Sequence, residues 1–153
     1  MRALIQRVSH AKVTVDGTVT GEIGEGLAVL LGVMEGDMEK QAEFLAGKLC
    51  GLRIFTDEND KMNLSVGDVG GGILVISQFT LGADCSHGRR PSFIRAAKPE
   101  IAERLYEYFV RCVCNQFDGP VGTGIFGAHM EFELLNNGPV TIWFDTDEME
   151  KHK

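Results

Sequence analysis

The segment Ser77-Gln78-Phe79-Thr80-Leu81 places two hydroxyls and one amide directly after the apolar run 73–76. Such a run predicts a buried strand, and backbone N–H groups lose their ladder partners where a strand ends. Polar side chains at that point can face a substrate together with free N–H donors. The alternative is a plain strand end with polar edge residues, and the residues alone leave both interpretations open.

A second polar segment is Asn136-Asn137-Gly138-Pro139-Val140-Thr141. Asn, Gly and Pro favour turns, so this segment predicts a connection between two strands, at 131–135 and 140–144. Since only about 5–6% of X–Pro bonds in folded proteins are cis, the sequence alone predicts no unusual peptide bond here.

Common catalytic and cofactor motifs are missing from the sequence. It contains no G-x-S-x-G, H-E-x-x-H, G-x-x-x-x-G-K-[ST] or G-x-G-x-x-G pattern, and its histidines are scattered. Cys85 and His87 near Asp84 could suggest a nucleophile or a metal site, but residues two apart on a loop rarely converge. The acidic turn 57–61 lacks the glycine and terminal glutamate of an EF-hand. We therefore expect neither a metal nor a cofactor.

The composition is that of a single water-soluble domain. The chain has 153 residues, of which 44% are hydrophobic and 24% charged, and no stretch reaches the ~18 consecutive apolar residues of a membrane span. An arginine interrupts the first apolar run and no small-residue cleavage site follows, so we expect no export signal and a cytoplasmic location. The four cysteines lack paired spacing and are expected to be reduced.

The apolar periodicity predicts an α+β domain. Strands are expected at 3–8, 11–15 and 18–23, then at 27–33, 53–56 and 73–76, with 27–33 central because it is apolar throughout. One helix is expected from a cap at Asp37 to about Gly51. A second, at 99–115, is expected to bury one face, formed by Ile101, Leu105, Tyr108, Phe109, Cys112 and Val113. We predict one domain (1–145) with two main helices on a mixed or antiparallel sheet, and a charged, flexible tail (146–153).

The charge distribution bears on possible partners. The net charge of −7 argues against nucleic-acid binding, which needs local positive potential. However, Arg89, Arg90, Arg95 and Lys98 lie within ten residues that contain no acid. This cluster could contact phosphates or could form a solvated basic loop.

Together, the S-Q-F-T-L and N-x-G-P-V-T segments closely resemble those of the D-aminoacyl-tRNA deacylase family. The animal-specific relatives in that family replace the serine and phenylalanine of the first motif, so Ser77 and Phe79 favour the D-specific branch. Residues 85–87 depart from the family pattern and receive no role. The resemblance covers nearly the whole chain and includes Leu4-Ile5-Gln6-Arg7-Val8, Arg53-Ile54-Phe55, Met62-Asn63-Leu64, Arg90-Pro91-Ser92-Phe93 and Thr123-Gly124-x-Phe126.

The resemblance implies a barrel-like fold and a homodimeric editing hydrolase that cleaves D-aminoacyl-tRNA and, as a side activity, glycyl-tRNA. In the family, a Gly-Pro pair with a cis bond reaches from one subunit into the other's active site and excludes L side chains; Gly138 and Pro139 match that pair. The family is described as using the 2′-hydroxyl of the terminal adenosine, with oxyanion donors that would lie near Phe79 and Thr80. Thr80 is then either a scaffold or the nucleophile.

Similarity also suggests roles for the other site residues. Ser77 and Gln78 would organise the pocket, Asn136 would join the Gly-Pro pair in substrate binding, and Phe126 and Met130 would hold the terminal adenine. The basic cluster at 89–98 would then be the region that contacts the acceptor stem of tRNA.

Two other functional classes stay open on the sequence: a small-molecule esterase and a non-catalytic RNA-binding module. The absence of a nucleophile elbow weighs against the esterase. The net charge and the lack of an exposed-aromatic ribonucleoprotein signature weigh against the RNA-binding module.

Overall fold

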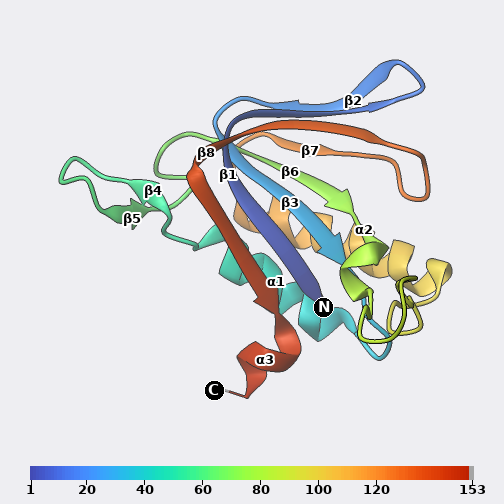
Figure 1. Cartoon of the computed structure of the whole chain (residues 1–153). Helices are drawn as coiled ribbons and strands as arrows, with labels where there is room; N and C mark the ends of the chain where they lie inside the picture. Colours follow the sequence, from blue (N-terminus) through green and yellow to red (C-terminus); the bar gives the residue numbers. More distant parts are fainter. Residues whose placement is uncertain (152–153) are drawn as a thin grey trace.

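A six-stranded mixed sheet forms the centre of the protein in the computed structural model, which describes residues 1–151 (Figure 1). Its strands run in the order β2 (Thr18–Ile23), β1 (Arg2–Val15), β3 (Gly26–Gly32), β6 (Gly72–Ser77) and β7 (Val121–Thr123), and β8 (Glu131–Asp145) pairs with β1. β3 and β7 run parallel to β6, whereas β1 is antiparallel to all its neighbours. The predicted central position of β3 is confirmed.

The sheet curves toward a nearly closed barrel because β1 changes partner along its length. Residues 2–8 of β1 pair with β3 and residues 11–15 pair with β2, while β8 follows β1 on its other side. The two predicted strands at 3–8 and 11–15 are therefore one continuous strand. A barrel-like mixed sheet, the predicted fold class, is confirmed.

Helices α1 (Glu39–Cys50) and α2 (Pro99–Gln116) lie side by side against one face of the sheet (Figure 1). The predicted buried face of α2 is correct for Leu105, Phe109 and Val113 but wrong for Ile101, which is 41% exposed. Tyr106 is buried and donates to the carbonyl of Val75, 2.8 Å away. The tyrosine turned toward the sheet is thus Tyr106, whereas the predicted one, Tyr108, packs at the edge of the core.

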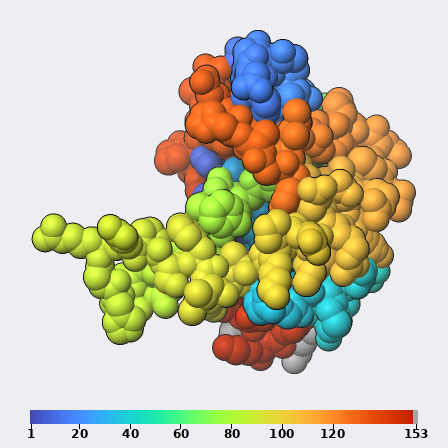
Figure 2. Space-filling view, turned by 90° about the vertical axis from the view of Figure 1, so that its right-hand side faces the viewer, coloured from blue at the N-terminus to red at the C-terminus, as the bar shows by residue number. Residues whose placement is uncertain are grey.

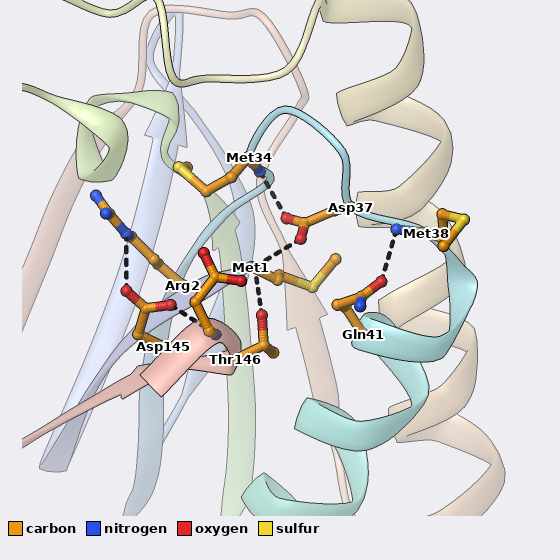
Figure 3. A network of polar contacts seen from close by, with 9 residues as sticks. Met1, Arg2, Met34, Asp37, Met38, Gln41, Asp145 and Thr146 are labelled. Atoms are coloured by element: carbon orange, nitrogen blue, oxygen red, sulfur yellow. Dashed lines mark hydrogen bonds and ion pairs between the residues drawn. The ribbon is translucent and has the colours of Figure 1, made fainter. Parts of the chain in front are cut away.

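The N-terminal cap of α1 differs from the prediction. The cap residue is Met38, not Asp37. The Asp37 carboxylate instead accepts from the backbone N–H of Met34 at 2.7 Å and pairs with the Met1 amino group at 2.8 Å (Figure 3). The Asp37 carboxylate forms this ion pair in place of the expected capping bond to α1. Local sequence patterns do not predict the pair, because Met1 and Asp37 are far apart in the sequence.

The C-terminal segment, predicted to be flexible from residue 146, begins as the short helix α3 (Thr146–Glu150). Thr146 is fully buried and its hydroxyl accepts from the Met1 amino group at 2.7 Å. Asp145 caps this helix by accepting from the N–H of Asp147. Residues 152–153 of the predicted tail lie outside the described residues.

Two small elements complete the fold. The short strands β4 (Phe55–Thr56) and β5 (Met62–Leu64) form a hairpin that projects from the body, and a 3₁₀ turn, η1 (Phe79–Gly82), follows β6 (Figure 1). β5 and β7 were not predicted, because three-residue strands carry too little periodicity. Within residues 1–151, no helix combines the length and apolar character that a membrane crossing requires.

Candidate active site

A cavity of about 640 Å³ opens beside the end of β6. Its wall comes from β3, β6, the start of α2 and the loop before β8, so segments far apart in the sequence share it. In Figure 2 the η1 region (bright green) lies between residues near 95–102 (yellow) and 125–132 (orange). Six of the site residues predicted from the sequence line it: Ser77, Gln78, Phe79, Lys98, Phe126 and Met130.

The η1 turn forms the rim of this cavity. β6 ends at Ser77, and the backbone N–H of Gln78 still pairs with the carbonyl of Leu31 at 2.8 Å. The chain then tightens into the 3₁₀ turn, whose first N–H groups, those of Phe79 and Thr80, have no acceptor within the turn. Phe79 is 57% exposed, and its ring meets Phe93 edge-on at 5.2 Å. Two N–H groups that have no acceptor within the turn therefore lie beside an aromatic rim.

Thr80 lies next to the cavity and is not among its lining residues. Its Oγ1 accepts a hydrogen bond from Nε2 of Gln78, 2.5 Å away. A lone pair occupied in this way is less available to attack a carbonyl carbon. Gln78 thus links the cavity wall to Thr80.

The cavity also contains groups that sequence patterns missed. Exposed His129 contributes to the lining together with buried Tyr106, and none of the described lining residues carries a carboxylate. Burial raises the pKa of Tyr106 to about 12, so its phenol stays neutral at physiological pH. No catalytic motif includes His129, and the residues across the cavity from it, such as Ser77 and Gln78, lie about 50 positions earlier in the chain.

The Gly138–Pro139 pair projects from β8 as a bulge, and its peptide bond is cis. Between the pairs Gln6↔Thr141 and Val8↔Asn136, β8 carries four residues where β1 carries one, so the two predicted strands at 131–135 and 140–144 form a single bulged strand. The predicted turn between them is wrong because both halves pair with the same strand, β1. Gly138 and Pro139 are exposed and do not line the cavity of their own chain.

The bulge is held by two side chains. The amide oxygen of Asn136 accepts from the N–H of Val140 at 2.9 Å, while its nitrogen donates to Oε1 of Gln6 and to Val140 O. Arg7 donates to the carbonyl of Asn137 at 2.9 Å and to that of Ile54 at 2.8 Å. The main chain at Gly138 is therefore fixed although it faces solvent.

Residues 84–92 form an arm that projects from the body (yellow-green in Figure 2). Paired hydrogen bonds of 2.8 and 2.9 Å between Asp84 and Ser92 close its base. A side-chain hydrogen bond from Ser86 lowers the pKa of Asp84. Arg89 and Arg90 are exposed near the end of the arm, and the other two members of the predicted basic cluster, Arg95 and Lys98, follow between the arm and α2.

Among residues 1–151, no group of three or more His, Cys, Asp or Glu side chains converges in a way that could hold a metal ion. The four cysteines carry free thiols.

Comparison with known proteins identifies the family. The model described as "D-Tyr-tRNA(Tyr) deacylase" matches residues 4–145. A D-aminoacyl-tRNA deacylase of Ruegeria pomeroyi is 61% identical over 95% of this chain and 99% of its own length. One from Alkaliphilus metalliredigens is 56% identical over 95% and 97% of the two chains.

A solved structure shares the fold of this chain. A protein described as c-Myc DNA Unwinding Element Binding Protein has a TM-score of 0.90 at 39% identity and covers 95% of this chain and 98% of its own. The family match spans both the η1 rim and the Gly138 bulge. The chain belongs to the D-Tyr-tRNA(Tyr) deacylase family.

Proposed function

We propose that this protein is a D-aminoacyl-tRNA deacylase of the cytoplasm that hydrolyses the ester between a D-amino acid, or glycine, and the 3′ end of tRNA. The observation that carries this proposal is the partly apolar cavity beside η1, a turn whose first two N–H groups have no acceptor within it. Its volume of about 640 Å³ lies in the range that accommodates a medium-sized ligand. The curated relatives at 56–61% identity carry the same activity in their names.

The terminal adenosine would enter between Phe126 and Met130, with its ester at the η1 rim. Hydrolysis passes through a tetrahedral oxyanion, and the N–H groups of Phe79 and Thr80 are the donors for it. One well-placed donor of this kind contributes about 3–4 kcal/mol to the transition state. Ser77 and Gln78 hold the turn that carries both donors.

The reacting hydroxyl would come from the RNA. Oγ1 of Thr80 already accepts from Gln78 at 2.5 Å, and the described cavity lining offers no carboxylate to deprotonate it. The terminal ribose carries a 2′-hydroxyl next to the scissile ester, positioned by the substrate itself. We assign Thr80 a positioning role and the 2′-hydroxyl the activation of water.

The chirality of the amino acid would be recognised by the main chain of a second copy of this protein. Gly138 and Pro139 are exposed and lie outside the lining of their own cavity. In a two-fold dimer each copy can offer the same bulge to the other's cavity. Because Arg7 and Asn136 fix the bulge, its backbone would bind the amino group of the substrate and leave no space for an L side chain. Glycine, which has no side chain, would be accepted.

The activity is tested with three substrates: D-Tyr-tRNA, L-Tyr-tRNA and an activated acetate ester. Hydrolysis of D-Tyr-tRNA alone is the expected result. Turnover of the simple ester alone would identify a small-molecule esterase, and tRNA binding without turnover would identify a binding module. Either outcome contradicts the proposal.

Sharing of sites between subunits is tested by mixing two inactive variants, Gly138→Ala and Gln78→Ala. A mixed dimer contains one site with an intact bulge and an intact cavity, so co-refolded chains should regain about one quarter of the wild-type activity. A mixture that stays inactive, although native mass spectrometry shows mixed dimers, would contradict the cross-subunit site.

The arm is expected to contact tRNA phosphates. The Arg89→Ala/Arg90→Ala variant should show a weaker salt dependence, with the slope of log(kcat/KM) against log[salt] reduced in magnitude by roughly 1.5. A matched control is Lys40→Ala/Lys61→Ala, which removes two exposed charges from residues outside the cavity lining. Equal slopes for both double variants would exclude a specific role for the arm.

A further inference from the structure

We propose that Arg2 is a positioning residue for the reaction: from outside the cavity lining it holds the η1 turn through the Leu81 carbonyl and so keeps the N–H donors of Phe79 and Thr80 in place. This inference rests on the proposed function. It assigns a role to a residue that neither the motifs nor the cavity lining include.

Arg2 makes a direct contact with the turn. Its Nη1 donates to the carbonyl of Leu81 at 2.7 Å, although the two residues are 79 positions apart. Leu81 follows Thr80 in η1, and its own N–H bonds weakly, at 3.3 Å, to the carbonyl of Gln78. A four-residue 3₁₀ turn has few internal hydrogen bonds. The charged contact from Arg2 is therefore a main restraint on where the turn lies.

The guanidinium is itself held on two further sides. Its Nε donates to Oδ2 of Asp145 at 3.2 Å (Figure 3), and it stacks 5.9 Å from the ring of Trp143. The side chain of Arg2 is only 11% exposed and that of Asp145 9%. A planar group with donors in fixed directions can bond a carboxylate and a carbonyl at once.

This contact joins the turn to the end of the chain. The second carboxylate oxygen of Asp145 accepts from the N–H of Asp147 and caps α3. Asp145 thus shares its oxygens between Arg2 and the first turn of α3. One guanidinium thus connects β1, β8, α3 and η1. The N–H donors at the cavity rim are therefore held in place by the sheet.

The expected effect is on the chemical step and not on binding. Arg2→Met keeps much of the side-chain volume but leaves the Leu81 carbonyl unbonded, so kcat for D-Tyr-tRNA should fall about tenfold while KM changes less than twofold. Arg2→Lys should recover part of the loss, since an ammonium can bond Leu81 but not Asp145 at the same time. The rate for glycyl-tRNA should fall by the same factor, because the oxyanion is common to both substrates.

The matched control is Lys12→Met on the same strand. Lys12 forms an ion pair with Glu133 at 3.2 Å, with side chains 41% and 67% exposed, so its loss should leave kcat unchanged. Thermal melting of all variants separates a general loss of stability from a displaced turn. An Arg2→Met protein with wild-type kcat, or one whose KM rises at constant kcat, would overturn the assignment to Arg2. A wild-type protein without D-Tyr-tRNA hydrolysis would overturn the proposed function instead.

Discussion

A D-Tyr-tRNA whose terminal adenosine lacks the 2′-hydroxyl is expected to be hydrolysed at least ~10³-fold more slowly than the normal substrate, within the range that a lost acid–base group produces. Thr80→Ala, in contrast, should keep most of the activity. The two results together would place the reacting hydroxyl on the RNA. The measurement is single-turnover deacylation of the 3′-linked ester, with each substrate at saturating enzyme.

The physical reason lies in the surroundings of each hydroxyl. Oγ1 of Thr80 is a hydrogen-bond acceptor for Gln78 at 2.5 Å and lies outside the cavity lining. A nucleophilic threonine needs an adjacent base to remove its proton. The one imidazole in the described lining, His129, is an exposed side chain of the loop before β8. His129→Ala is therefore the control and should retain activity. Threonine would be the nucleophile if the Thr80→Ala and His129→Ala proteins were both inactive and the wild-type protein still hydrolysed the 2′-deoxy substrate.

The second large effect is expected from Gly138→Ala. This residue has φ +146°, and an added Cβ would lie 2.7 Å from Cγ2 and 2.9 Å from the backbone N of Val140. Both values are below normal contact distances, so the bulge must move. Since we propose that this main chain binds the amino group, D-Tyr-tRNA hydrolysis should fall at least ~10²-fold, the loss expected from a misplacement of about 1 Å.

Gly17→Ala is the matched control for this substitution. Gly17 also has a positive φ, +81°, but an added Cβ there has no heavy atom within 4 Å. It lies in the β1–β2 turn and should cost stability of roughly 1 kcal/mol without loss of activity. The ratio of D to L hydrolysis is the decisive measurement. A Gly138→Ala protein that is fully active and equally selective would show that this bulge does not read chirality.

The two site segments differed in how well local patterns described them. The apolar run before Ser77 correctly predicted a buried strand with a polar end, because a strand that is buried on both faces has an uninterrupted apolar sequence. The 3₁₀ turn that follows was not predicted, since it depends on tertiary bonds such as that from Arg2 to the carbonyl of Leu81. At Gly138 and Pro139, composition indicated a turn, but both flanking halves pair with β1 and make one strand.

The helices also show that local patterns predict apolar packing better than polar contacts. The 3.6-residue periodicity located α1 and α2 to within about two residues, and it identified most of the buried face of α2. It assigned the cap of α1 to Asp37, whose carboxylate is instead bound to the Met1 amino group. It also placed Tyr108 on the buried face, where that residue packs only partly buried against the core, whereas Tyr106 is the one whose hydroxyl bonds a buried carbonyl. Both errors concern polar groups whose partners lie elsewhere in the chain.

The sequence by itself determined the fold class, the central strand, the two helices and, through motifs spread along nearly the whole chain, the family. Hydrophobic periodicity and turn chemistry are local properties, and a string of residues carries them without its fold. Only the tertiary structure decided that Phe126, Met130 and Ser77 share one cavity, that Arg7 and Asn136 fix the bulge at Gly138, and that Arg2 reaches the η1 turn. The contacts of Arg2 and Arg7 join residues that are tens of positions apart, and they exist because the curved sheet brings β1, β6 and β8 together.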